Sequence, residues 1–177
     1  MLDVSLELFS EHGFEGTTLQ QIADRLGVSK AALYYHFESP KDEILKALVA
    51  PVTDGIDALL DEYESRDWTP AERRNFLKEY LNYLLAHRRV IAYMTSDLAI
   101  IAHPVVSGGH QRRRARIEAM LLGDASSFRE KVRLTMAFSG VMAVIARHPE
   151  VDAEELREAL VDAASTLLRS KHRRPAA

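Results

Sequence analysis

The side chains best suited to chemistry in this sequence lie close together between Lys30 and His36. This stretch offers a lysine ammonium, two phenols and an imidazole, with two small alanines among them. Such donors can bind phosphate oxygens or the edges of bases, and small neighbours allow a close approach. They can act together only if one element presents them on the same exposed surface.

Two short helices around a glycine turn would present them in this way. A hydroxyl at Thr17 or Thr18 can cap the first helix, and Gly27 can end it in the left-handed conformation that glycine adopts at little cost. Ser29 can cap the second helix. The pattern predicts a helix-turn-helix, whose second helix enters the major groove of DNA. Its apolar anchors would be Leu19, Ile22, Ala23, Leu26, Val28, Leu33 and Phe37.

Over about its first 48 residues the sequence resembles the tetracycline-repressor (TetR) family of transcriptional regulators. The resemblance rests on Leu8-Phe9, Gly13-Phe14, Thr17-Thr18, Ile22-Ala23, Leu26-Gly27-Val28-Ser29 and Leu33-Tyr34-Tyr35-His36-Phe37. It implies an all-α homodimer, in which a three-helix DNA-binding head precedes a larger helical body that dimerises and binds a small effector. By position, it implies base contacts from Lys30, Ala31 and Ala32, a groove or backbone contact from Tyr35, and phosphate contacts from Thr17, Thr18, Tyr34, His36 and Lys41.

Two features depart from the family pattern. The family usually has x-Ser-Lys after the phenylalanine, whereas this chain has Glu38-Ser39-Pro40-Lys41, so its lysine lies one place later. Ser39 as N-cap and Pro40 at the first helical position still predict a helix start. The chain also begins inside its first helix, so contacts from the basic arm that relatives usually carry there are not assigned.

The charge of the predicted head is unusual for a DNA-binding protein. Residues 1–49 contain four lysines and arginines against eight aspartates and glutamates. Non-specific binding depends on neutralising phosphates, which this composition does not favour. We therefore expect a sequence-specific dimer of moderate affinity and strong salt sensitivity, with its acidic side chains turned away from the DNA.

Helical patterns continue through the rest of the chain, about nine helices in all, without an internal repeat. Pro51 lies inside a predicted helix and indicates a kink or break near residues 47–51, between a head of residues 1–47 and a body of residues 48–177. Outside the helix-turn-helix, the expected helices cover about residues 2–12, 40–64, 69–87, 88–102, 106–122, 125–147 and 152–171.

Composition is that of a soluble protein. The chain has 177 residues, 47% of them hydrophobic, and no cysteine. No apolar run reaches the roughly 18 residues of a membrane span, and no signal peptide is recognisable, so we expect a cytoplasmic protein with no membrane partner. The lack of cysteine excludes disulfides and thiolate metal sites.

An effector pocket is expected between the middle helices. Phe76, Tyr80 and Tyr83 lie at i, i+4 and i+7, opposite a leucine face, so their helix needs buried neighbours on two sides. Side chains from adjoining helices could complete an apolar chamber. The alternative, that these are ordinary core residues, stays open for each. The full candidate set is Phe76, Tyr80, Tyr83, Tyr93, Met94, Asp97, Ile117, Met120, Met136 and Met142.

The last two helices are expected to form the dimer interface. One carries an apolar stripe and the other small residues that allow close approach, although both could instead face the body's own core. A two-fold dimer would place its recognition helices about 34 to 36 Å apart, on a near-palindromic operator. The candidates are Ser139, Gly140, Ala143, Leu156, Leu160, Ala163, Ala164 and Leu167.

Other chemistry has little support in the sequence. His12 with Glu15, or His103 with His110, lacks the further ligands of a metal site, so no metal or other cofactor is expected. The arginines of 112–116 are either a solvated face or a clamp for an anionic effector. No catalytic motif is present, and an enzyme is not expected.

These features predict a DNA-binding transcriptional regulator, a repressor that a small-molecule effector releases from its operator. One alternative is a helical ligand sensor or interaction module with weak or lost DNA binding, which the acidic head would explain. Another is a helical enzyme, for which Asp97 with a histidine in the central cavity is the candidate pair. Activation instead of repression stays open.

Overall fold

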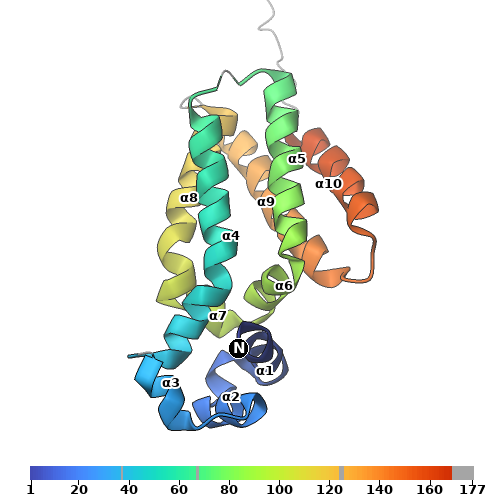
Figure 1. Cartoon of the computed structure of the whole chain (residues 1–177). Helices are drawn as coiled ribbons and strands as arrows, with labels where there is room; N and C mark the ends of the chain where they lie inside the picture. The colour runs from blue at the N-terminus through green and yellow to red at the C-terminus, as the bar shows by residue number, and fades with distance from the viewer. Residues whose placement is uncertain (37, 67, 124–125, 169–177) are drawn as a thin grey trace, which may run out of the picture.

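The chain folds into helices joined by short connections. The computed structural model describes residues 1–36, 38–66, 68–123 and 126–168, and within them it has ten helices and no strand (Figure 1). The predicted all-α class is confirmed. The helices are α1 (Leu2–Gly16), α2 (Leu19–Leu26), α3 (Lys30–His36), α4 (Pro40–Glu64), α5 (Pro70–Ala86), α6 (Arg88–Ser96), α7 (Leu98–Ala102), α8 (Pro104–Leu122), α9 (Phe128–Arg147) and α10 (Ala153–Leu168).

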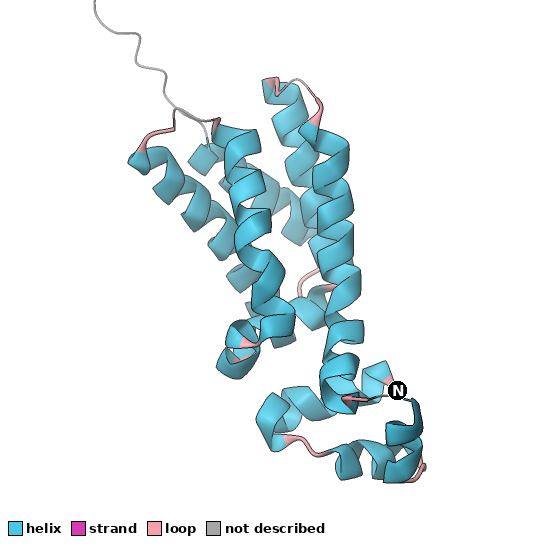
Figure 2. Ribbon diagram, turned by 90° about the vertical axis from the view of Figure 1, so that its left-hand side faces the viewer, coloured by secondary structure: helices cyan, strands magenta, loops and turns pink. Residues whose placement is uncertain are grey.

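The helices form a small head and a longer body. Figures 1 and 2 show α1, α2 and α3 grouped at one end, with α4 running from this group along the body. In the body, α4 packs against α8 and α5, while α9 packs against α6 and α10. The head contacts the body through α1, which touches α4, α6 and α7, and through α3, which touches α4.

The helix-turn-helix has the predicted local signals. The Thr18 hydroxyl accepts the Gln21 N–H at 3.2 Å, and the Gln21 side chain accepts the Thr18 N–H at 2.7 Å, which together make a capping box. Gly27 ends α2 with φ of 69°. Ser29 Oγ accepts the Ala32 N–H at 3.2 Å at the start of α3. Each of these three predictions is confirmed, because each depends on neighbours along the chain.

Two boundaries in the helical pattern are set by single residues. The first helical stretch of α1 ends at Gly13, close to the predicted end near residue 12, where φ is 75° and ψ is 164°, and a further helical stretch continues α1 to Gly16. Glycine adopts this conformation without a Cβ clash. The single helix expected over residues 88–102 is divided into α6 and α7 at Asp97, which has an extended conformation and caps α7.

The helix α4 is continuous through Pro51, so the predicted alternative of a break is wrong, whereas a kink at this point stays a prediction. A neighbouring helix supports it at this point, because the Tyr83 hydroxyl of α5 donates to the Pro51 carbonyl. The Tyr83 ring occupies the space where a Cβ of Gly55 would lie. Packing of this kind can offset the hydrogen bond that proline removes.

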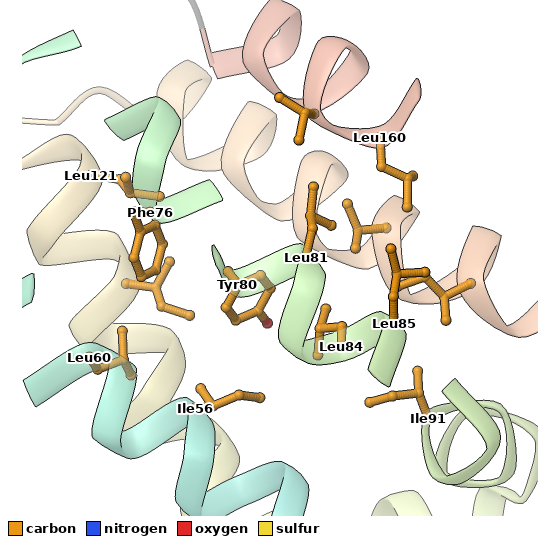
Figure 3. Close-up of a cluster of buried hydrophobic side chains, with 14 of the residues drawn as sticks. Ile56, Leu60, Phe76, Tyr80, Leu81, Leu84, Leu85, Ile91, Leu121 and Leu160 are labelled. Carbon is orange, nitrogen blue, oxygen red and sulfur yellow. The ribbon is translucent and has the colours of Figure 1, made fainter. Parts of the chain in front are cut away.

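Two apolar clusters stabilise the fold. In the body, α5 points side chains to both sides, Phe76 toward Leu121 of α8 and Leu81 toward Leu160 of α10 (Figure 3). The second cluster consists mainly of residues of the head and the start of α4, and it also includes Tyr93 of α6 and Ile100 of α7. Head and body therefore share buried surface, and the predicted division after residue 47 stays a prediction.

Replacing Gly55 by alanine should destabilise the protein by about 1–3 kcal/mol, because the new methyl group displaces the Tyr83 ring and breaks its bond to Pro51. Urea unfolding would measure this loss. Gly108→Ala is the control, since a Cβ there meets nothing and should stabilise α8 by about 0.5–1 kcal/mol. Equal stability of Gly55→Ala and wild type would contradict the role given to Tyr83.

Candidate nucleic-acid interface and ligand pocket

The helix α3 presents an exposed face at the end of the head. Leu33 is buried and anchors the helix, whereas Lys30 and Ala31 are exposed and Ala32 is half-buried. Tyr35 is 86% exposed. An aromatic ring with this exposure presents a large surface that can pack against a partner.

The structure describes the side chains of only some other residues of this face. Tyr34 is 53% exposed, and the Lys30 ammonium lies 5.9 Å from the centroid of its ring, within range of a cation–π interaction. The backbone of His36 completes α3, but its side chain and Phe37 lie outside the described residues. The predicted phosphate contact of His36 and core role of Phe37 are therefore not placed.

Thr17 does not have the predicted role. Its side chain is 1% exposed, and its hydroxyl donates toward the carbonyls of Leu8 at 3.0 Å and Gly13 at 2.8 Å. These contacts secure the end of α1 beyond the interruption at Gly13. A phosphate contact from this hydroxyl is excluded by burial, whereas Thr18 is exposed and its predicted phosphate contact stays a prediction.

Lys41 lies against the head instead of projecting freely. Its ammonium is 4.4 Å from the centroid of the Phe14 ring and 3.5 Å from the carbonyl oxygen of Glu15. The side chain is half-buried. Its predicted phosphate contact stays a prediction, and the single-residue shift noted in the sequence still places the lysine at the α1–α4 junction.

Several acidic side chains of the head face the body. Asp3 and Glu7 lie 3.5 and 3.9 Å from guanidinium nitrogens of Arg89 in α6. Asp42 lies 3.6 Å from Nε2 of His103, next to α8. Three of the eight acidic side chains of the head are therefore paired with cationic or histidine side chains of the body.

A cavity of about 170 Å³ lies within the body. Four predicted residues line it: Tyr80, Met94, Ile117 and Met142. Burial raises the pKa of the Tyr80 phenol, so this wall stays uncharged, although the nearby Arg113 charge acts in the opposite direction. An effector contact from these residues stays a prediction.

The other six pocket candidates do not line this cavity, and their predicted effector contacts stay a prediction. Phe76 and Met120 are buried in the core, Tyr83 packs over Gly55, and Met136 is 58% exposed. Tyr93 and Asp97 lie at the head, as described below. Helical periodicity correctly predicted that α5 has buried neighbours on two sides. It could not show which residues of these two sides border a cavity.

Of the polar wall, the sequence offered Arg113 and Arg114 as one alternative, a clamp for an anionic effector, but did not place them with His110 beside the predicted pocket residues. From α8, His110, Arg113 and Arg114 line the cavity together with Ile117. Their spacing of i, i+3, i+4 and i+7 places them on one helical face, and this periodicity was the signal that could have found them. The remaining lining residues are Val52, Thr53, Ile56, Val106, Leu134, Thr135, Phe138 and Ser139.

Asp97 connects the head to the body. Its Oδ2 accepts the backbone N–H of Phe14 at 2.8 Å, and its Oδ1 accepts the N–H of Ala99 at 2.9 Å. The first bond reaches α1 just after the interruption at Gly13, and the second caps α7. Tyr93 stacks on Phe9 at a centroid distance of 5.9 Å beside it, and burial followed by the Asp97 charge raises the pKa of that phenol.

The predicted dimer stripe on α10 is wrong in part. Leu156, Leu160 and Ala164 are buried within this chain, because α10 packs on α5 and α9. Exposed apolar side chains lie on α9 instead, where Phe128 is 82% and Met136 58% exposed. Of the remaining candidates, Ser139, Gly140 and Ala163 are exposed, whereas Ala143 and Leu167 are half-buried.

The described residues contain neither a candidate metal site nor a candidate membrane span. Within residues 1–36, 38–66, 68–123 and 126–168, no three histidine, aspartate or glutamate side chains are grouped so that they could hold a metal ion. No helix in the same part of the chain is long and apolar enough to cross a membrane.

The sequence of the head matches those of known bacterial regulatory proteins. Residues 1–48 match the family model described as bacterial regulatory proteins, tetR family. Over 41 residues the chain is 51% identical to the biofilm operon icaADBC HTH-type negative transcriptional regulator IcaR of Staphylococcus aureus. The Staphylococcus epidermidis regulator of that name is 34% identical over 64 residues. These stretches cover 23% and 36% of this chain, but only 22% and 35% of the regulators' lengths.

Solved structures resemble the whole chain. AmtR of Mycobacterium smegmatis superposes with a TM-score of 0.71 at 24% identity, covering 94% of this chain and 83% of AmtR. The TetR family regulator PfmR of Thermus thermophilus gives 0.68 at 24% identity, covering 97% and 98%. FadR of Bacillus subtilis, solved in complex with stearoyl-CoA, gives 0.64 at 13% identity, covering 93% and 96%. Head and body therefore have the fold of these regulators.

Replacing Asp97 by asparagine should destabilise the protein by about 1–3 kcal/mol, because asparagine has one acceptor oxygen for the two N–H groups that Asp97 now binds. Urea unfolding would measure the change. Asp152→Asn is a matched control, since Asp152 caps α10 through Oδ1 alone and its amide can keep that acceptor. Equal losses in both variants would mean that Asp97 acts as an ordinary helix cap.

Proposed function

We propose that this chain, which belongs to the tetR family of bacterial regulatory proteins, is a sequence-specific DNA-binding repressor that a small molecule releases from its operator. The observation that carries the proposal is the exposed face of α3, held at the end of a head whose core extends into the body that contains the cavity. The cytoplasm is its expected location.

Contacts to DNA would come from both ends of α3. Lys30 and Ala31 at its start would approach base edges, whereas Tyr34 and Tyr35 would lie along the backbone. The carboxylates of Asp3 and Glu7 would not oppose this approach, since they pair with Arg89 on the body side. Few cations would act in each head, so the affinity should depend strongly on a second head.

A second copy of the chain would supply that head. Phe128, Val132 and Met136 lie four residues apart on α9 and are exposed, which is an unusual arrangement for large apolar side chains unless a partner covers them. Exposed Gly140 of α9 and Ala163 of α10 would allow close helix approach beside this stripe. A two-fold dimer of this kind would bind a near-palindromic operator.

The cavity would hold the effector. An engineered cavity of roughly 150 Å³ in another protein binds benzene, so about 170 Å³ suits a small molecule without further opening. FadR, which has the same fold, binds stearoyl-CoA, and a larger ligand would require the body to expand. Met94 lines the cavity on α6 and lies one turn before Asp97, so an effector that moved α6 would also move the contact with the head.

A ligand sensor without DNA binding is the second candidate, and the acidic composition of the head favours it. An enzyme has less support, because Asp97 lies outside the cavity and no aspartate or glutamate is among its described lining residues. Selection of random DNA duplexes by the protein would decide between repressor and sensor. Enrichment of a palindrome supports the repressor, and failure to enrich any sequence supports the sensor.

Replacing Lys30 by alanine should weaken binding to the selected duplex by about 1–3 kcal/mol and relax preference at the bases that it reads. Tyr34→Ala should instead weaken all duplexes to a similar extent. Gel-shift titration on selected and scrambled duplexes would measure both effects, with Lys78→Ala on the exposed surface of α5 as the control. Unchanged affinity in both head variants would exclude α3 as the recognition helix.

Replacing Val132 by aspartate should convert the dimer to a monomer, because the stripe would then bury an unpaired charge. Sedimentation equilibrium would measure the mass, and affinity for the palindrome should fall with it. Asn75→Asp adds the same charge on the exposed side of α5 and should leave the dimer intact. A Val132→Asp protein that remains dimeric would place the interface elsewhere.

A further inference from the structure

The cavity has an uneven distribution of charge. His110, Arg113 and Arg114 approach it from one face of α8, and no aspartate or glutamate is among its described lining residues. The rest of the wall is largely apolar, with Phe138 and Met142 of α9 on the other side. A ligand that fills this space would meet cations at one part and hydrocarbon at the other.

Arg113 is the most enclosed of these cations. Its side chain is 14% exposed, and its Nη2 lies 2.9 Å from Oδ2 of Asp57, behind the cavity wall. The same Asp57 oxygen lies 3.3 Å from Nη2 of Arg112, so one carboxylate faces two guanidinium groups and positive charge remains. The Nε atom of Arg113 is buried and has no hydrogen-bond partner. The guanidinium is thus incompletely paired within the chain, and a ligand carboxylate at its cavity-lining part would add charged hydrogen bonds.

Arg114 adds a second guanidinium at the same place. Its Nη2 donates to Oγ1 of Thr135 at 2.7 Å, a bond that joins α8 to α9 across the cavity wall. Within the part of the chain that the structure describes, it has no ion pair with a carboxylate. A neutral hydroxyl can be exchanged for a charged acceptor, since hydrogen bonds between two charged groups are stronger.

We propose that the cavity selects a small apolar carboxylic acid, whose carboxylate binds Arg113 and Arg114 and whose hydrocarbon part packs against Phe138 and Met142. The inference rests on the proposed function, because it names the class of effector for the same cavity. Two adjacent guanidinium groups match the two oxygens of a carboxylate. A neutral alcohol of equal size would accept weaker hydrogen bonds and would leave the positive charge of Arg113 and Arg114 uncompensated.

A neighbouring glycine allows the geometry to be tested without removing the charge. The Arg113 guanidinium lies where a Cβ of Gly109 would be, so Gly109→Ala would push the guanidinium away from its present position. The cost in folding is small because a flexible side-chain end must move. Gly108→Ala changes the adjacent position of the same helix, where a Cβ meets nothing, and is its matched control.

The direct experiment is calorimetric titration of the full chain, without DNA, with butanoate, hexanoate and octanoate and with the alcohols of equal length. We expect at least one acid to bind roughly tenfold more tightly than its alcohol. Arg113→Gln and Gly109→Ala should remove most of that difference without changing alcohol binding. Arg112→Gln should retain it, because Arg112 shares Asp57 but does not line the cavity.

Three results would overturn the proposal: binding of no acid in the series, equal binding of acids and alcohols, or full acid preference in Arg113→Gln and Gly109→Ala. Separate gel shifts then test the function on which it rests. Arginine-dependent acid binding that leaves the protein on its operator supports the ligand class and contradicts effector release. Release by neutral compounds alone supports the repressor and contradicts the ligand class.

Discussion

The fold depends on one carboxylate at the junction of its two parts. Asp97 accepts the backbone N–H of Phe14 in the head and the N–H of Ala99 at the start of α7, with one oxygen for each. Gly13 makes the first bond accessible by interrupting α1, and Asp97 itself interrupts the helical run between α6 and α7. The Tyr93 and Ile100 side chains extend the apolar cluster of the head toward the body. The hydrogen bond from Phe14 to Asp97 therefore lies next to buried apolar surface. The orientation of α3 relative to the body follows from this junction.

The same junction gives the cavity a physical route to the head. Met94 borders the cavity one turn before Asp97 on α6, and Val106 borders it shortly after α7. A ligand that displaces α6 must therefore either move Asp97 or strain its bonds. Such a ligand shifts the equilibrium only by its difference in affinity between the two arrangements, and a reversal from 99:1 to 1:99 requires a preference of about 10⁴-fold. A cavity lined by two guanidinium groups can supply such a preference through charged hydrogen bonds.

Local features of this fold could be predicted from the sequence, whereas long-range choices could not. Thr18, Gly27 and Ser29 act on residues within four positions, so their roles in helix capping and termination were predictable. Thr17 has the same residue type as Thr18, but only the packing of α1 shows that it is buried. Leu156 and Leu160 form a helical stripe that fits either a core or an interface, and tertiary contacts with α5 and α9 decide for the core. Pro51 predicted a kink or a break, and the structure excludes the break, because α4 is continuous there. The polar face of α8 was visible as a spacing but not as the wall of a cavity.

Amide hydrogen exchange at Phe14 tests most directly whether Asp97 holds the head. This N–H donates to a carboxylate 83 residues away, so its protection reports the junction itself and not the helix around it. We predict slow exchange in the wild type by NMR, comparable with the buried amides of Ile22 and Ile44, and rapid exchange at Phe14 alone among the three in Asp97→Ala. Equal protection of Phe14 in the two proteins would contradict the role assigned to Asp97.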